Sequence, residues 1–246
     1  MIDGKSSPGM SFKKHFIYWI LPSSFTLACT LIYFYNLFGL EDFIAPKINR
    51  EFGLIENVQL LLLILIFLRA IKGIRTREAR IEKYGFLLVA IVTAFMILEE
   101  IDYGLHYYDY LTGKPQITQV VIFDQKVRNI HNNGPMQNLF KLTSYGVVII
   151  FFVILPFITS KFKEKHAVLN FLSPSRLIIS TAACLLILNQ IALYLYHKYN
   201  SPSSSLTANV SEFEETMTYY IILLYISEMV KKPQGMLTSK SKAIKT

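Results

Sequence analysis

Two glutamates, two aspartates and a histidine lie close together in the stretch ILEEIDYGLHYYD, residues 97–109, at the end of a strongly apolar run. If this stretch is helical, Glu99, Asp102 and His106 fall within one narrow stripe at 100° per residue. A stripe of two carboxylates and an imidazole can bind a divalent cation or exchange protons. A solvated helix end also carries such residues by chance, and that alternative stays open.

A second acidic stretch, VSEFEETMTYY, repeats this arrangement, because Glu212, Glu215 and Tyr219 have the spacing i, i+3, i+7. Acids in the first turn of a helix are also favoured by the helix dipole, which explains Glu212 and Glu215 without any function. The dipole does not explain Glu99 and Glu100, because they lie at a predicted helix C-terminus, where anions are disfavoured. These two glutamates therefore need a partner.

Two further stretches contribute polar residues. Glu56 and Gln59 lie one helical turn apart at the start of another apolar run, and His131 stands between Asn129 and Asn132 in the sequence NIHNN. A loop histidine standing alone is usually a surface residue. Together with the other acids, it is a candidate metal ligand.

The elements that must position these residues are membrane-spanning helices. The 246 residues are 52% hydrophobic and 17% charged, with a mean hydropathy of +0.38, which is typical of membrane proteins. Six apolar runs are long enough to cross a bilayer: 16–38, 54–71, 84–105, 143–160, 176–197 and 213–230. We therefore predict an all-α polytopic fold with six transmembrane helices. The last helix is expected to begin near Ser211, which forms a capping box with Glu214.

The charges predict the orientation of these spans. Eighteen of the 25 Lys and Arg residues fall on the side that holds both termini, so that side is expected to be cytoplasmic. The cytoplasmic face then carries a net charge of +13 and the outer face −5. We expect a cytoplasmic tail over 1–15, a transmembrane domain over 16–230 with an extracytoplasmic segment at 106–142, and a disordered basic tail over 231–246. The chain is predicted to lie in a lipid bilayer, with a bacterial inner membrane as the expected location and no nucleic acid as a partner.

This orientation puts all of the candidate residues on the outer side, although it was derived from Lys and Arg alone. Ionisable residues at the ends of membrane spans commonly face the bundle interior and mark function. We therefore predict one shared site. Its candidate metal ligands are Glu56, Glu99, Asp102, His106, His131 and Glu215, and its candidate general bases are Glu100 and Glu212.

The stretches GLIEN (53–57), EEIDYGL (99–105) and NIHN (129–132) resemble a group of uncharacterised multi-pass bacterial membrane proteins. Their pattern is a Gly-Leu-Ile-Glu entry to one span, E-E-I-S-W-G-Q at the end of the next, and N-L-H-N. The resemblance covers the middle third of the chain. It implies the site positions Glu56, Glu99, Glu100, Gly104, Asn129, His131 and Asn132. This sequence departs from the pattern at Asp102, Tyr103 and Leu105. The resemblance implies no particular reaction.

Functions from two classes fit these residues. The first is a metal-dependent enzyme that acts on a lipid or a lipid-linked substrate, with Zn, Mn or Fe generating a nucleophile from bound water. The second is a transporter, or a membrane subunit that binds protons or cations. A structural membrane subunit with solvated acids is a third alternative. Measuring whether the purified protein contains bound metal distinguishes the enzyme from the transporter.

Overall fold

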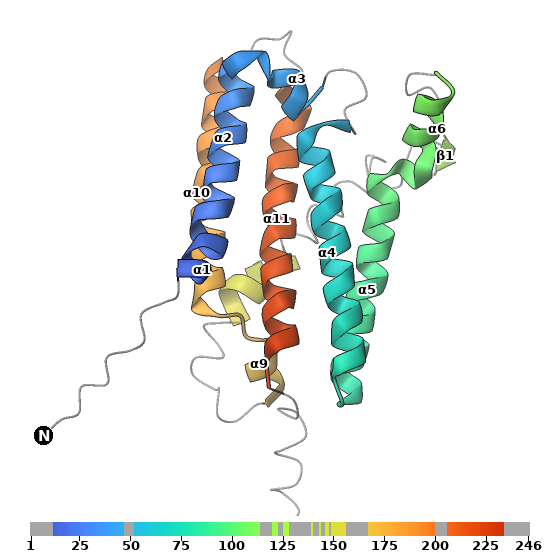
Figure 1. Cartoon of the computed structure of the whole chain (residues 1–246), viewed down its shortest axis with the longest axis vertical. Helices are drawn as coiled ribbons and strands as arrows, with labels where there is room; N and C mark the ends of the chain where they lie inside the picture. Colours follow the sequence, from blue (N-terminus) through green and yellow to red (C-terminus); the bar gives the residue numbers. More distant parts are fainter. Residues whose placement is uncertain are drawn as a thin grey trace, which may run out of the picture.

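The computed structural model describes residues 12–46, 52–113, 120–122, 125–127, 139, 143, 146–147, 149–155, 167–199 and 206–233. Long helices dominate this part of the chain (Figure 1). Its first helical run comprises α1 (Phe12–His15), the π-helix η1 (Phe16–Ile20) and α2 (Leu21–Tyr35). The other long helices are α4 (Leu54–Thr76), α5 (Arg80–Glu100), α10 (Arg176–Tyr199) and α11 (Leu206–Lys231).

Short elements connect or flank the long helices. They are η2 (Leu37–Gly39), α3 (Glu41–Ile44), η4 (Asp102–Gly104), α6 (Leu105–Leu111), η5 (Ile149–Ile154) and α9 (Ala167–Leu172). The strands β1 (Val120–Ile122) and β2 (Gln125–Val127) form an antiparallel pair. The all-α prediction is therefore confirmed for the bundle, and this small hairpin is an addition to it.

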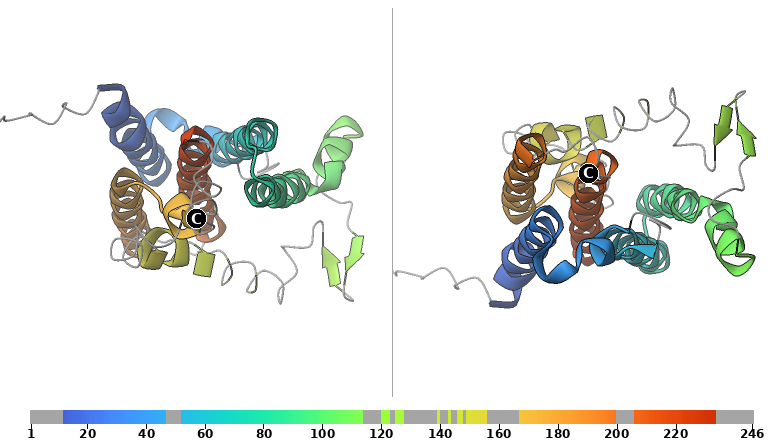
Figure 2. Two further views of the ribbon diagram at one scale, coloured as in Figure 1. Left: turned by 90° about the horizontal axis from the view of Figure 1, so that it is seen from below. Right: turned by 90° about the horizontal axis from the view of Figure 1, so that it is seen from above.

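The helix α11 lies in the middle of the bundle, between α4 and α10, when the molecule is viewed from either end (Figure 2). On one side α4 packs against α5, and on the other α10 packs against α2. The largest group of buried apolar residues joins these helices, with Leu63 and Ile66 from α4, Ile178 from α10 and Leu224 from α11. The residues of α11 in this group run from Met217 to Met229, so this helix packs against its neighbours along much of its length.

Among the residues that the structure describes, three helical segments are long and apolar enough to cross a membrane: Phe12–Tyr35, Leu54–Thr76 and Arg80–Glu100. Leu61, Leu68, Leu88 and Ile91 on these segments are exposed, and a lipid bilayer is an environment that suits such faces. The fifth and sixth predicted spans are helical as α10 and α11, while the fourth is described at 143 and in parts of 146–155.

The helices α4 and α5 approach each other closely at Gly73. A Cβ atom at this position would lie 2.5 Å from Cγ of the buried Phe86 ring. Because glycine has no side chain, the Phe86 ring can rest directly on the α4 backbone. This contact packs the C-terminal part of α4 against the N-terminal part of α5.

Candidate functional site

The outer end of the bundle, defined as the end that carries α3 and α6, is uppermost in Figure 1. The helices α4 and α11 begin at this end, and α5 ends toward it (Figure 1). Glu56 lies in the first turn of α4, Glu99 and Glu100 lie in the last turn of α5, and Glu212 and Glu215 lie in the outer part of α11. The alternating direction of the chain therefore brings these acids to the same end of the molecule.

A buried tyrosine on α11 joins two of the predicted acidic stretches. The hydroxyl of Tyr219 donates a hydrogen bond of 2.8 Å to Oε1 of Glu100 on α5. Tyr219 is only 6% exposed, and the negative charges of Glu215 and Glu212 also act on its hydroxyl. The predicted spacing of Glu212, Glu215 and Tyr219 thus brings them to one place, and Glu100 comes to it from a second helix.

A buried amide on α4 adds a third helix to this arrangement. Nε2 of Gln59 donates to the backbone carbonyl oxygen of Glu212 at 2.9 Å and to its Oε2 at 3.2 Å. Gln59 has no exposed surface. Its amide nitrogen faces the carboxylate, which fixes the orientation of the amide because the opposite one would place two oxygens against each other. We call Gln59, Glu100, Glu212, Glu215 and Tyr219 the outer polar cluster.

The predicted stripe of Glu99, Asp102 and His106 is wrong, because the helix ends at Glu100. Asp102, Tyr103 and Gly104 all have positive φ angles, of 48°, 54° and 88°. Glycine adopts this conformation without strain, and aspartate tolerates it better than most residues. The reversal turns α6 away from the axis of α5, so the 100° periodicity does not continue past Glu100.

Glu99 is buried, with 4% of its surface exposed, and accepts a hydrogen bond from the hydroxyl of Tyr103. Partial desolvation of the phenol, together with this bond and the charge of Glu99, raises the pKa of Tyr103 to about 12. The phenol therefore remains a proton donor to Glu99 throughout the physiological range. A bulky residue such as tyrosine rarely adopts a positive φ angle. The bond to Glu99 helps to hold Tyr103 in this unfavourable conformation.

His106 and Asp102 are buried in the region of this reversal. The imidazole of His106 packs against aromatic rings, with centroid distances of 5.5 Å to Phe52 and 4.0 Å to Tyr107. Phe52 also contacts Tyr110, at 5.0 Å between ring centroids. The described contacts of His106 are thus those of a residue that anchors α6 to the start of α4.

The structure brings together some of the predicted site residues. Glu100, Glu212 and Glu215 belong to the outer polar cluster, and Glu56, Glu99, Asp102 and His106 lie at the same end of the bundle. Gly104 forms the reversal described above. His131, Asn129 and Asn132 lie outside the described residues.

Within the described ranges, no three His, Cys, Asp or Glu side chains are grouped so that they could hold a metal ion. The donors of the outer polar cluster are oxygen atoms from carboxylates, a phenol and an amide, a set that suits hard cations and protons better than zinc. Glu100, Glu212 and Glu215 could each contribute a carboxylate to a site for such an ion, but among the described residues the three do not form a metal site by themselves.

Two features of the outer end were not predicted from the sequence. The partners of the acids proved to be Tyr219 and Gln59, whose positions near acids along the chain gave only an indirect signal. The last helix begins at Leu206, so the capping-box prediction for Ser211 and Glu214 is wrong, and both residues lie inside the helix. Their spacing of three residues also occurs within any helix, which is why the motif misled.

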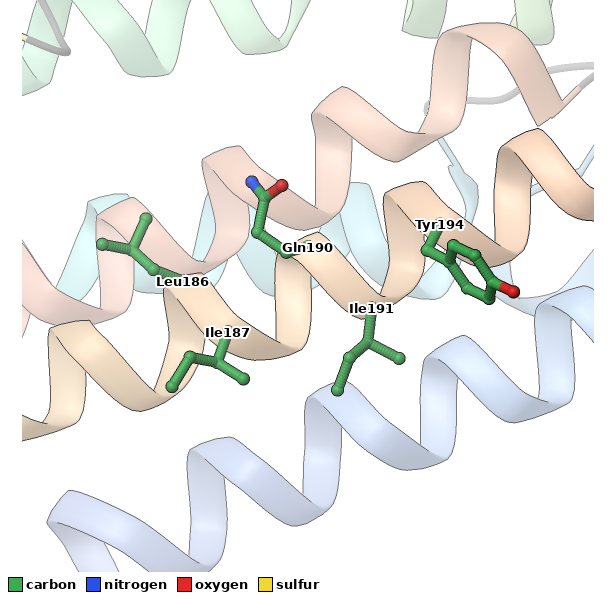
Figure 3. A pocket seen from close by; sticks show the side chains of 5 residues that line it. All are labelled: Leu186, Ile187, Gln190, Ile191 and Tyr194. Carbon is green, nitrogen blue, oxygen red and sulfur yellow. The ribbon is translucent and has the colours of Figure 1, made fainter.

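An open apolar groove lies along α10, away from these acids (Figure 3). It has a volume of about 370 Å³ and is lined by Leu186, Ile187, Gln190, Ile191 and Tyr194. All five residues come from one helix, and none of them belongs to the predicted site. The groove lies on an exposed face of α10.

Neither the family models, nor the curated proteins, nor the solved structures contain a match to this chain.

Proposed function

We propose that this chain is a six-span membrane protein, with both termini in the cytoplasm, whose outer polar cluster binds protons or a hard cation. The observation that carries this proposal is the hydrogen bond to Glu100 from the buried hydroxyl of Tyr219, on which the charges of Glu212 and Glu215 also act. A partly buried carboxylate near other negative charges is costly to keep ionised, so it takes up a proton or attracts a cation. Acids in this position within a helical bundle are typical of ion and proton pathways.

The chemistry follows from the donors that surround each carboxylate. The Tyr219 hydroxyl stabilises Glu100 as an anion, and the Gln59 amide does the same for Glu212. An added proton would be taken up by one of the acids whose charges act on the Tyr219 phenol. A cation would instead be shared by carboxylate oxygens from α5 and α11.

Proton binding can be measured on the purified protein in lipid nanodiscs by the infrared C=O stretch of protonated carboxyl groups during acidification. We expect this band to lose intensity in Glu215→Gln and Glu100→Gln. The exposed acid Asp42, on α3 at the same end, provides the matched control Asp42→Asn. An unchanged band in both cluster variants would contradict a proton site. Calorimetric titration of the same proteins with Ca²⁺, Mg²⁺ and Na⁺ tests the cation alternative.

A metal-dependent enzyme that acts on a lipid or lipid-linked substrate is a second proposal. Glu100 and Glu212, its candidate general bases, belong to the outer polar cluster, and Glu56 and Glu99 lie at the same end of the bundle. This function also needs His131 as a ligand. Elemental analysis for Zn, Mn and Fe separates the proposals, because stoichiometric metal that is lost in His131→Ala favours the enzyme.

The six-span topology can be tested by labelling single cysteines with a membrane-impermeant maleimide. The background is Cys29→Ser with Cys184→Ser, since these are the two cysteines of the chain. We expect Ser7→Cys to be labelled from the cytoplasmic side and Tyr108→Cys from the outer side. Labelling of both positions from one side would overturn the topology.

A further inference from the structure

The carboxylate of Glu228, near the inner end of α11, ties together three parts of the chain. Its Oε1 accepts hydrogen bonds from the hydroxyl of Tyr18 at 2.6 Å and from the hydroxyl of Ser175 at 2.7 Å. Its Oε2 accepts a third bond, of 3.2 Å, from the backbone N–H of Ser175. Tyr18 belongs to the first long helical run, and Ser175 directly precedes α10. We call these three residues the inner latch.

Tyr18 lies in the π-helix η1, where the first helical run departs from regular α-helix. Two side chains hold this segment from outside: the hydroxyl of Tyr220 donates to the carbonyl of Ile17 at 2.6 Å, and the hydroxyl of Thr181 donates to the carbonyl of Tyr18 at 2.9 Å. Short π-helical segments within α-helices recur at functional sites. The latch therefore holds the segment in which the first helical run changes from α-helix to π-helix.

The latch needs Glu228 as an anion. An anion is favoured beside Ser175 because α10 begins at the next residue, where its backbone N–H groups carry partial positive charge. A protonated carboxyl would keep one oxygen as a good acceptor and would turn the other into a donor, so it could not receive all three bonds.

The other groups around the latch are fixed by bonds to backbone carbonyls. Tyr225 on α11 donates to the carbonyl of Leu172 at 2.7 Å. Lys232 donates to the carbonyls of Phe171 and Ser173, and Arg77 donates to that of Met229. Of the titratable groups in these contacts, Glu228 is the one whose change of charge removes bonds between the first helical run, α10 and α11.

We propose that Glu228 is a protonation-controlled latch at the inner end of the bundle. As a carboxylate, it holds the π-helical segment and the start of α10 against α11. When Oε2 takes up a proton, the bond from the Ser175 backbone N–H is lost, and the two hydroxyl bonds to Oε1 weaken because their acceptor is no longer charged. The inner end of the first helical run then separates from α10. This inference concerns the inner end alone and does not depend on what the outer polar cluster binds.

Hydrogen–deuterium exchange of the protein in nanodiscs tests the latch, with Glu228→Gln as its permanently neutral form. At neutral pH we expect the amides of Ser175 and Ile178 to exchange roughly tenfold faster in this variant than in the wild type, because hydrogen bonds to a charged group are lost. As the pH falls, the ratio of the two rates should approach one, because the wild type becomes protonated as well. Comparing the two proteins at each pH cancels the intrinsic pH dependence of exchange.

The control is Glu78→Gln, which neutralises an exposed acid in the connection between α4 and α5 and should leave these rates unchanged. Equal rates for Glu228→Gln and the wild type at neutral pH would overturn the latch. A ratio that stays at its neutral-pH value in acid would overturn its control by protonation.

A disulfide gives a second readout between α2 and α10. Oγ of Ser23 and Sγ of Cys184 are 3.4 Å apart, so Ser23→Cys in a Cys29→Ser background should form a disulfide with Cys184. At one fixed pH, we expect Glu228→Gln to slow this reaction several-fold. Tyr18→Phe, which removes one bond of the latch and leaves the carboxylate in place, should slow it less and serves if Glu228→Gln fails to fold. Unchanged rates in every folded variant would contradict the latch.

Discussion

The hydroxyl of Tyr219 on α11 and the carboxylate of Glu100 on α5 form a 2.8 Å hydrogen bond across 119 positions of the sequence. Glu100 stands at the C-terminus of α5, where the helix dipole disfavours an anion. The phenol supplies a donor that offsets this unfavourable position. The bond therefore explains why a glutamate is tolerated at the end of a membrane-length helix.

Replacement of Tyr219 by phenylalanine should lower the free energy of unfolding by about 1 to 3 kcal/mol, because Glu100 then loses a buried donor. Chemical unfolding in mixed micelles measures this change. The control is Tyr107→Phe, since Tyr107 is 42% exposed, and it should change the free energy by less than about 0.5 kcal/mol. If Tyr219→Phe in a Glu100→Gln background costs as much as it does alone, the two side chains are not coupled.

Gln59 offers a separate test of the outer polar cluster. In Gln59→Leu, the carboxylate of Glu212 loses the amide donor at 3.2 Å and its backbone carbonyl loses the donor at 2.9 Å. Stability should fall by about 1 to 3 kcal/mol. Gln190→Leu is the matched control, because Gln190 is an exposed glutamine of α10. Chemical unfolding in mixed micelles measures the stability of both variants. If both unfold like the wild type, Gln59 does not stabilise the cluster.

The face shared by Glu212, Glu215 and Tyr219 was predictable because a helix repeats every 3.6 residues, and a single stretch of sequence contains the whole pattern. The meeting of this face with Glu100 and Gln59 was not predictable. It depends on how α11 packs between neighbouring helices, and composition and periodicity do not specify which residues meet across such an interface.

The end of α5 at Glu100 was not predicted, for a different reason. The apolar run continues through Ile101 and Tyr103, so hydropathy alone predicts a span that extends to residue 105. Gly104 was the one local signal of a reversal, and a single glycine is common inside membrane helices. The three successive residues with positive φ are accompanied by a local bond from Tyr103 to Glu99 and by the packing of His106 against Phe52, and hydropathy specifies neither contact.

Gly73 and Gly85 should respond in opposite ways to replacement by alanine. A Cβ at Gly73 would lie 2.5 Å from the Phe86 ring, whereas a Cβ at Gly85 would meet no atom within 4 Å. Gly73→Ala should cost about 1 to 3 kcal/mol from overpacking. Gly85→Ala should add about 0.5 to 1 kcal/mol of stability, since alanine favours a helix. Unfolding titrations of the two variants check this, and a smaller residue in Gly73→Ala/Phe86→Leu should restore part of the loss.

The buried ion pair between Arg77 and Glu82 predicts a large effect at the inner end. Nη1 of Arg77 lies 3.4 Å from Oε2 of Glu82, and both side chains are 1% exposed. The guanidinium also donates to the carbonyls of Lys232 at 2.8 Å and Pro233 at 3.2 Å, just beyond the end of α11. A positive charge is favoured at a helix C-terminus, so the pair joins the connection between α4 and α5 to α11.

Arg77→Met should therefore lower the unfolding free energy by about 3 to 5 kcal/mol, because it leaves the carboxylate of Glu82 buried without its counter-charge. Arg77→Met combined with Glu82→Leu should recover a substantial part of this loss, because no isolated charge remains in the interior. The exposed Arg75, in the last turn of α4, provides the control Arg75→Met, which should change stability by less than about 0.5 kcal/mol. Unfolding titrations of all four proteins measure the coupling. A double variant that is no more stable than Arg77→Met would mean that the arginine acts through the carbonyls at the end of α11 rather than through Glu82.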